Sequence, residues 1–172
     1  MTRFSIRIEA PEKIQEALRN AIEERLDKAL NDIADFIGSE SDRILRDSEE
    51  GSFDTGFLAG SLVVDKDDFL YKEVGYGALY AGYVEFGTRP HFPPVEVIYQ
   101  WCWRKRNDLK ITYNKKKEVL FNGKPHNADV LKVAWAIANK MAKDGTEPKP
   151  FMRPSFILGK SKAGEFIKRA MK

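Results

Sequence analysis

A chain of 172 residues with 42% hydrophobic residues suits a single globular domain with a core of its own. Its formal net charge is only +3, from 29 basic and 26 acidic side chains, which argues against a dedicated DNA-binding domain with a strongly basic face. No apolar leader opens the sequence and no run approaches the ~20 apolar residues that span a bilayer, so we expect a protein that is made in the cytosol and binds no membrane.

The N-terminal third predicts a strand followed by a long helix. Residues 3–9 alternate apolar and polar side chains, as a half-buried strand does. Pro11 suits the first turn of a helix, and from Ile14 onward apolar residues recur every three or four positions. We expect an amphipathic helix to about Arg46, with Gly38 as a possible bend. Its apolar stripe packs on the domain's own sheet or, given its length, against a neighbouring subunit.

Short elements follow in the middle of the chain. Asp54 is a candidate N-cap for a short helical turn that ends at Ser61. Residues 61–77 predict two strands joined by a turn at Asp65–Asp68, because clustered Asp residues favour tight turns. These strands supply the predicted antiparallel sheet.

Residues 95–106 predict a further helix. Val95 and Ile98 fall on one side of it, together with Trp101 or Cys102. Cys102 is the single cysteine and cannot form an intramolecular disulfide, so we expect a buried thiol that acts as a small apolar side chain.

Residues 109–122 predict a hairpin that looks like an insertion. Apolar residues alternate on two arms, at residues 111–113 and 119–121, and the exposed tip consists of Lys115, Lys116 and Lys117.

The C-terminal part predicts two helices separated by an extended segment. Asn127 is a suitable N-cap and Gly145 a suitable stop for a helix between them. Residues 146–158 are punctuated by prolines and predict extended backbone, and residues 160–172 predict a short basic helix. Strands and helices without a regular alternation indicate an α+β fold, with an antiparallel sheet packed against the long N-terminal helix and additional shorter helices, in one domain over residues 1–172.

The sequence offers no clear catalytic or metal site. His91 and His126 are the only histidines, and with Cys102 they form no metal-binding spacing. There is no nucleophile elbow and no phosphate-binding loop. We therefore expect no enzyme, no metal and no cofactor. An enzyme would need a pocket holding Glu85 and His91 with shifted pKa values, and the sequence offers no second catalytic partner for them.

The segment Tyr80–Pro94, "YAGYVEFGTRPHFPP", combines rings, prolines and glycines. Gly87 permits a sharp turn at positive φ, and the prolines stiffen the backbone after this turn. Glu85 and Arg89 are candidates for an ion pair. We expect half of the large rings to complete the core and the others to anchor an interface; the rings are Tyr80, Tyr83, Phe86 and Phe92.

Three segments in order resemble the tail-component family found in the neck region of long-tailed phages. They are a T-G-x-L-x-x-S segment at Thr55–Ser61, a Y-A-x-Y-V-E-F-G-T segment at Tyr80–Thr88, and a P-x-P-F-hydrophobic-R-P segment at Pro148–Pro154. Ala59-Gly60 departs from the polar or basic residues of many relatives. The residues that the resemblance and the aromatic segment together place at an interface, or in its architecture, are Thr55, Gly56, Leu58, Tyr80, Tyr83, Glu85, Phe86, Gly87, Thr88, Arg89, Phe92, Pro150, Phe151, Arg153 and Pro154.

The resemblance implies a non-enzymatic virion protein of the head–tail junction or the tail end, assembled in the host cytoplasm. Proteins of this region generally act as rings of identical subunits around the DNA channel, docked on connector, head-completion or tail proteins. DNA would pass without sequence-specific binding, which fits the modest net charge because every phosphate contact adds affinity. We expect Tyr80–Pro94 and Pro150–Pro154 to brace one another and to shape a surface for a subunit or a partner.

A nucleic-acid-binding accessory protein stays open as the alternative. Its cations would be Lys115, Lys116, Lys117 and those of the C-terminal helix, with Trp103 and Tyr113 nearby in the sequence. Basic and aromatic residues together can clamp single strands. Exposed helix faces and a solvated hairpin tip explain the same residues without a ligand.

Overall fold

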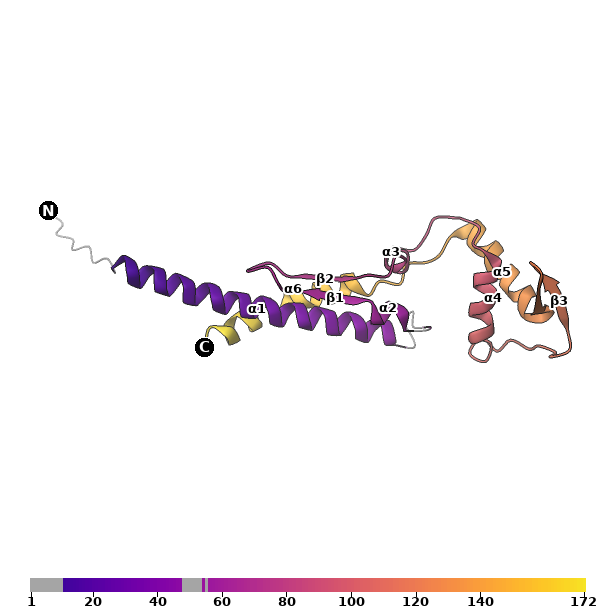
Figure 1. The fold of residues 1–172 in the computed structure, drawn as a ribbon, viewed down its shortest axis with the longest axis horizontal. Coiled ribbons are helices and arrows are strands. Elements are labelled where there is room, and N and C mark those ends of the chain that lie inside the picture. Colours follow the sequence, from indigo (N-terminus) through magenta and orange to yellow (C-terminus); the bar gives the residue numbers. More distant parts are fainter. Residues whose placement is uncertain (1–10, 48–53, 55) are drawn as a thin grey trace. The chain divides into compact units, whose positions relative to one another are not determined.

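The structure, a computed structural model, describes residues 11–47, 54 and 56–172, and within them it forms six helices and four strands (Figure 1). The predicted α+β class, with an antiparallel sheet against a long N-terminal helix, is confirmed. The predicted strand at residues 3–9 lies outside the described residues. Internal contacts group the elements into two compact units. We describe each unit separately, and the single domain over residues 1–172 stays a prediction.

The α1/α6 unit comprises residues 11–47, 57–78 and 151–172. Helix α1 (Glu12–Arg46) ends where the periodicity predicts. Helix α6 (Met152–Ala170) packs antiparallel along it (Figure 1). Gly159 lies against Ile37, and Arg25 Nη1 donates to the Met171 carbonyl at 2.9 Å. The two helices therefore share the main interface of this unit.

A small sheet covers another part of α1. Strand β1 (Leu62–Asp65) pairs antiparallel with β2 (Glu73–Tyr76), with Leu62 opposite Tyr76. The Tyr76 hydroxyl shares a hydrogen bond of 2.8 Å with the buried Ser41 hydroxyl of α1. Gly38 of α1 also lies under the sheet, where an added Cβ would stand 3.2 Å from Val64 Cγ2. Helix α1 runs through Gly38 without a break, so the glycine permits close packing of the sheet and does not bend the helix.

The connection between β1 and β2 is tied to α1 by one carboxylate. Asp27 Oδ1 accepts from the Leu70 backbone N–H at 2.8 Å and from Lys72 Nζ at 2.8 Å. The Lys72 side chain is only 5% exposed and also donates to the carbonyls of Lys66 and Asp68. The ammonium hydrogen bond, and next the Leu70 N–H, hold the pKa of the Asp27 carboxyl below its ordinary value. This contact fixes the sheet on the helix from the turn side.

Two predictions about this part of the chain are wrong. Helix α6 begins at Met152, so most of the predicted extended segment 146–158 is helical. Pro154 is tolerated because it lies in the first turn, where backbone N–H groups have no intrahelical acceptor. Helix α2 (Phe57–Gly60) begins three residues after Asp54, which does not cap it. The Asp54 carboxylate instead accepts from Arg104 Nη2 at 2.6 Å within the other unit.

The α4/α5 unit comprises residues 54, 56 and 79–150. It contains α3 (Ala81–Phe86), α4 (Val95–Arg104), α5 (Ala128–Asp144), and the strands β3 (Glu118–Phe121) and β4 (Lys124–Asn127). Helices α4 and α5 pack together around a core that includes Cys102, which is fully buried as predicted. Burial raises the pKa of the Cys102 thiol. The buried members of this core are Val95, Tyr99, Cys102, Val130, Leu131, Ala134 and Ala138.

The hairpin of this unit differs from the prediction. Its arms are β3 and β4, with Glu118 opposite Asn127, and its tip is Asn122-Gly123, both at positive φ. Positive φ at both central residues is the geometry of a tight two-residue turn, which Asn-Gly favours. Lys115, Lys116 and Lys117 are therefore not at the tip; they precede β3 in a separate turn. The N-cap at Asn127 and the helix stop at Gly145 are confirmed.

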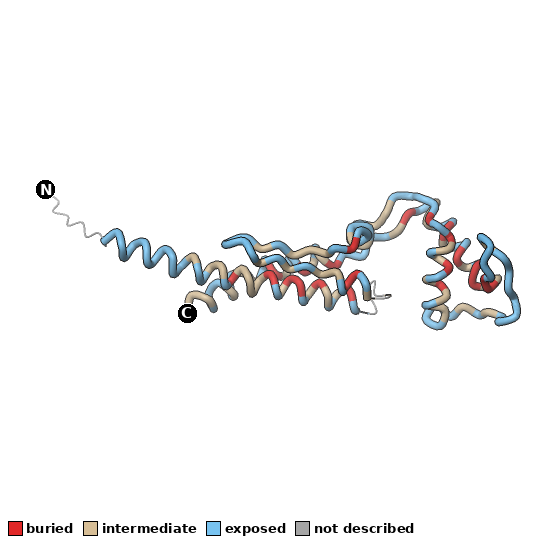
Figure 2. The backbone as a smooth tube through the Cα atoms, in the orientation of Figure 1, coloured by how far each residue is buried: buried red, intermediate tan, exposed pale blue. Residues whose placement is uncertain are grey.

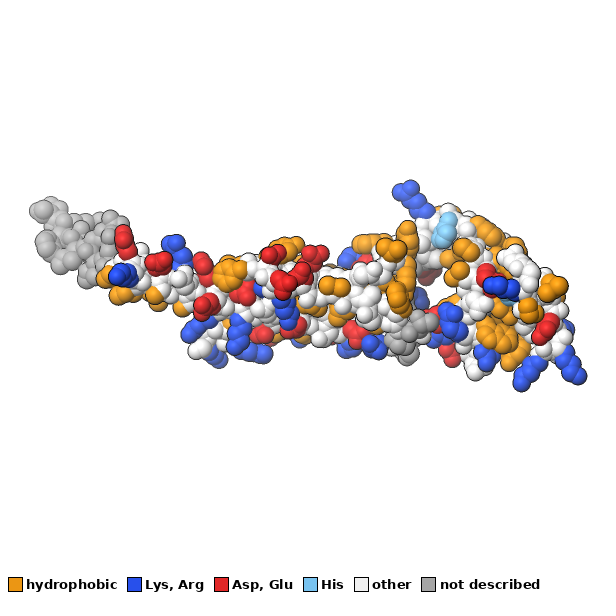
Figure 3. All heavy atoms as spheres, in the orientation of Figure 1, with side chains coloured by type: hydrophobic (Ala, Val, Ile, Leu, Met, Phe, Trp, Pro, Cys, Tyr) orange, Lys and Arg blue, Asp and Glu red, His pale blue; other side chains and the backbone are white. Residues whose placement is uncertain are grey.

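Burial is uneven along α1. Its buried residues lie between Ala29 and Leu45, whereas residues 11–22 are all exposed (Figure 2). Ile14, Leu18 and Ile22 are about half exposed, at 51, 56 and 48%. Hydrophobic and charged side chains alternate over this part of α1 in the space-filling view (Figure 3). The first three turns thus carry an apolar stripe that the rest of their unit does not cover. No helix in the described part of the chain is both long and apolar enough to cross a bilayer.

Candidate functional site

The segment Tyr80–Pro94 forms the short helix α3, a turn at Gly87 and an extended run before α4. Its four large rings are all exposed, by between 41% for Tyr80 and 66% for Phe86. Phe92 contacts Trp135 of α5 with ring centroids 5.9 Å apart, yet it is still 53% exposed. None of the four rings belongs to the buried core of the described residues, so the expectation that some of them complete the core is wrong.

Backbone hydrogen bonds fasten this segment to the residues that follow α5. Thr88 and Thr146 form an antiparallel bridge with N–H to O distances of 3.1 and 3.2 Å, and their hydroxyls are 3.0 Å apart. The Lys149 N–H donates to the Val84 carbonyl at 2.8 Å. The His91 N–H donates to the Met141 carbonyl at 3.3 Å. Three sets of backbone contacts therefore fasten the aromatic segment, Tyr80–Pro94, to the end of α5 and the chain after it within one unit.

Two glycines make this approach possible. Gly87 has φ +70°, and a Cβ there would overlap the Thr146 carbonyl and stand 2.9 Å from Pro148 N. Gly145 has φ +76°, and a Cβ there would overlap the Thr88 carbonyl. The turn and the returning chain thus pass closer together than any larger residue permits at either position. We call this paired backbone, residues 84–91 with 141–149, the double-glycine brace.

The remaining residues predicted for an interface have different positions. Thr55 lies outside the described residues; Gly56 has φ +79° and Leu58 is buried in α2. Glu85 is buried, whereas Arg89 is exposed and the described residues show no ion pair between them. Pro150 is exposed at the end of the α4/α5 unit.

The last segment continues into the α1/α6 unit. Phe151 is buried there with its ring edge-on to Tyr76 at 5.0 Å. Arg153 and Pro154 follow it in the first turn of α6. The hydrogen bond from Lys149 to Val84 joins the second and third resembling segments. A brace that involves Pro150–Pro154 themselves stays a prediction.

A pocket of about 550 Å³ opens in the α4/α5 unit, between α4 and the chain that leads into the hairpin. Rings form much of its wall: Tyr99 stacks on Trp103 with centroids 6.3 Å apart, and Tyr113 meets Trp103 edge-on at 5.6 Å. We call it the aromatic pocket. Its lining residues are Tyr99, Gln100, Trp103, Arg106, Tyr113, Lys115, Glu118, Pro125, His126 and Asn127.

Buried polar groups fix the floor of the aromatic pocket. His126 is 2% exposed, and its Nε2 lies 2.7 Å from Glu96 Oε2. The hydrogen bond from Gln100 and, to a smaller extent, the interaction with His126 lower the pKa of the Glu96 carboxyl. The Tyr99 hydroxyl accepts from the Asn127 N–H at 3.0 Å. These bonds hold the ring of Tyr99 in place.

Arg106 lies over this aromatic wall. Its guanidinium carbon is 4.8 Å from the centroid of the Trp103 ring, and Nη1 donates to the Trp103 carbonyl at 2.6 Å. Its Nε is buried and has no hydrogen-bond acceptor among the described residues. A buried donor without an acceptor is costly, so this atom lowers the stability of the folded unit.

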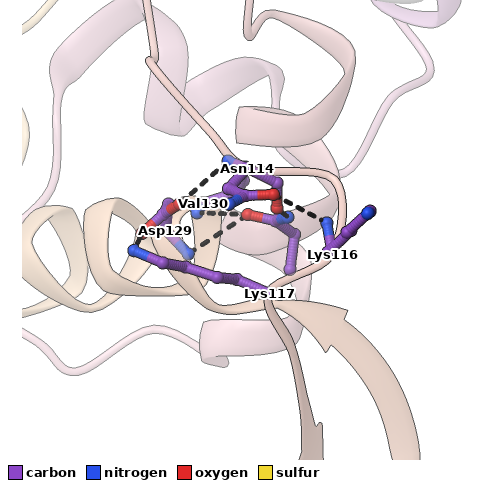
Figure 4. A network of polar contacts seen from close by, with 6 residues as sticks. Asn114, Lys116, Lys117, Asp129 and Val130 are labelled. Carbon is purple, nitrogen blue, oxygen red and sulfur yellow. Dashed lines mark hydrogen bonds and ion pairs between the residues drawn. The ribbon is translucent and has the colours of Figure 1, made fainter.

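The turn that contains Lys115, Lys116 and Lys117 lies next to the pocket and is ordered by a polar network around the start of α5 (Figure 4). Asn127 Oδ1 accepts from the N–H groups of Asp129 and Val130, and its Nδ2 donates to the Asn114 carbonyl at 2.7 Å. Asp129 accepts from the Asn114 N–H at 3.0 Å and pairs with Lys117 at 3.4 Å. These donors lower the pKa of the Asp129 carboxyl.

Of the three lysines, only Lys115 lines the aromatic pocket. Sequence reasoning placed Trp103 and Tyr113 near cations but did not identify the pocket, because Tyr99, Arg106 and His126 come together only through folding. Within the part of the chain that the structure describes, no group of three or more Asp, Glu, His or Cys residues is arranged to hold a metal ion. No family model, curated protein or solved structure matches the chain.

Proposed function

We propose that the protein is a non-enzymatic structural component of a phage virion, at the head–tail junction or the tail end, that acts as a homo-oligomeric ring around the DNA channel. Its further partners in this proposal are connector or head-completion proteins and tail proteins. The three ordered segments that resemble the neck family are the starting point.

The observation that carries the proposal is an exposed row of rings on a stiff backbone. Tyr83 and Phe86 are 65 and 66% exposed on α3; Tyr83 directly precedes the double-glycine brace, and Phe86 lies within it, next to Gly87. Aromatic side chains held this way lose little conformational entropy on binding and are frequent anchors of protein interfaces. The two most exposed rings of the second segment are therefore those that a neighbouring subunit or docking partner would cover.

The charge of the chain supports the DNA-channel part of the proposal. A ring that lets DNA slide must avoid a strongly basic bore, and the chain has a formal net charge of only +3. Several cations are already engaged: Lys117 pairs with Asp129, Lys162 lies over the Phe36 ring at 4.8 Å, and Arg169 lies over the Phe166 ring.

Substitution on α3 tests the proposal. Phe86→Ser and Tyr83→Ser remove exposed rings, so we expect the fold to be kept and self-association or docking on connector protein to fall about ten-fold or more, as for an interface anchor. Association is measured by light scattering on a size-exclusion column, and folding by circular dichroism. Leu120→Ser is the matched control, since Leu120 is 81% exposed in the same unit but belongs to none of the three segments. The proposal would be contradicted if all three variants associated as strongly as the unsubstituted protein does.

A further inference from the structure

The aromatic pocket has a combination of groups that the proposed structural role does not use. Its lining includes two rings that meet edge-on, Trp103 and Tyr113, and two cations, Lys115 and Arg106. A pocket of about 550 Å³ falls within the ordinary size range for small-molecule sites. Rings next to cations are the chemistry that recognises a flat base joined to a phosphate.

The cations are available to a ligand. Lys115 forms no ion pair within the described residues, in contrast to Lys117, which is held by Asp129. The Arg106 guanidinium is fixed by the Trp103 ring and carbonyl, and the residue lines the pocket. An arginine that is already positioned forms hydrogen bonds to a phosphate at a low entropic cost. Lys115 and Arg106 therefore form a ready anion site.

The pocket also carries one acid. Glu118, the first residue of β3, lines the same space and forms no ion pair in the described part of the chain. A carboxylate accepts from the exocyclic amino group of cytosine, whereas thymine offers a carbonyl oxygen at that position. Gln100 and Asn127 are less free, because their amides already bond to Glu96 and Asn114. Glu118 is thus the group that can distinguish bases.

We infer that the aromatic pocket binds one nucleotide, with its base against Trp103 and Tyr113, its phosphate at Lys115 and Arg106, and an amino group of the base donating to Glu118. The nucleotide comes either free in solution or as one unit of a single strand. This site goes beyond the proposed structural role and does not depend on it, because it lies on other residues than the rings of α3.

The test uses the full chain and two probes. Binding of a labelled single-stranded oligo-dC is measured by fluorescence anisotropy at low and at moderate salt, and binding of free dCMP by the quenching of tryptophan fluorescence. We expect oligo-dC to bind more tightly than oligo-dT. Tyr113→Leu should weaken binding about five-fold or more, as loss of a stacking partner does. If dCMP competes with oligo-dC, the pocket is a free-nucleotide site. If oligo-dC binds but dCMP does not compete with it, the pocket is a single-strand site.

Charge variants with a matched control decide whether the pocket is responsible. Lys115→Gln and Arg106→Gln should each weaken binding several-fold, whereas Lys140→Gln, which removes an exposed charge from α5 outside the pocket, should change it little. Glu118→Gln should abolish the preference for oligo-dC. The inference is overturned by absence of binding to both probes, by an equal loss in Lys140→Gln, or by equally tight binding of double-stranded DNA or an acidic peptide.

Discussion

Gly159 is a point of close approach between α6 and α1. A Cβ at this position would overlap Ile37 Cγ1 and stand 2.8 Å from Ile37 Cδ1. We predict that Gly159→Ala destabilises the protein by about 1–3 kcal/mol, the usual cost of overpacking a core, and lowers the melting temperature in a thermal scan. Added Ile37→Val should restore part of the loss, because it removes the Cδ1 atom.

Gly164 supplies the control in the same helix. No atom lies within 4 Å of a Cβ built there, so Gly164→Ala should be neutral or stabilising through the better helix propensity of alanine. Equal melting temperatures for the two variants would show that α6 does not pack on α1 through Gly159.

Asp27 gives the α1/α6 unit a predictable acid sensitivity. Its pKa is lowered by Lys72 and the Leu70 N–H, so the folded state favours the carboxylate. The stabilisation is present above the unfolded pKa of about 4 and is lost as the pH falls through the lower pKa of the folded state. Asp27→Asn should therefore melt several degrees lower at pH 7 but show a flatter loss of stability below pH 4.

Thermal scans between about pH 2.5 and 7 measure this difference. Glu24→Gln, which removes an exposed carboxylate of the same helix, controls for the change of net charge. A profile for Asp27→Asn that runs parallel to that of the unsubstituted protein would contradict the role of the Asp27–Lys72 pair.

At the scale of elements, the double-glycine brace fixes the backbone of the aromatic segment. Gly87→Ala combines a strained positive φ with overlap on the Thr146 carbonyl, whereas Gly123→Ala meets the same φ but no atom within 4 Å. We predict a loss of about 1–2 kcal/mol for Gly123→Ala, from backbone strain alone, and a clearly larger loss for Gly87→Ala. Urea unfolding monitored by tryptophan fluorescence compares them, and equal losses would mean that residues 84–91 and 141–149 are not in close contact.

Elements with strong local signals were predictable from the sequence. The periodicity of α1 gave its end at Arg46, and Asn127 and Gly145 marked the limits of α5 correctly. The predicted hairpin tip at the three lysines is wrong because Asn122-Gly123 is the stronger turn signal. The predicted C-terminal helix is too short because the prolines in residues 146–158 favour extended backbone, whereas Pro154 lies in the first turn of α6, which accepts proline.

The candidate sites show a similar division. The aromatic segment is contiguous in the sequence and was found there, but exposure of all four rings depends on packing and could not be read from residue types. The aromatic pocket is lined by residues from α4, the following loop and the hairpin, so no local sequence pattern predicts it.

The first turns of α1 form a second apolar surface at the element scale. Ile14, Leu18 and Ile22 follow one another at intervals of four residues and are about half exposed. An isolated helix end of this length is marginal in water, so a partner that covers the stripe would stabilise it. We predict that Leu18→Glu weakens self-association several-fold in light scattering, while Asn20→Glu, on an exposed polar position of the same helix, does not. Unchanged association of Leu18→Glu would exclude the stripe from the interface.

For the whole molecule, the proposed role depends on assembly. The described residues expose the α3 rings and the α1 stripe, among other apolar side chains, and the net charge is only +3. Surfaces of this kind are costly on a free subunit and are typical of association sites. Both are expected to be covered in the particle.

The proposed ring assembly can be tested on the protein itself. The most direct measurement is size-exclusion chromatography with light scattering over a wide concentration range, with and without connector or tail protein, followed by negative-stain images of any large peak. We predict a discrete mass at an integer multiple of the 19.7 kDa subunit, and closed rings with a central opening. A strict monomer at every concentration, which ignores the added neck partners, would contradict it.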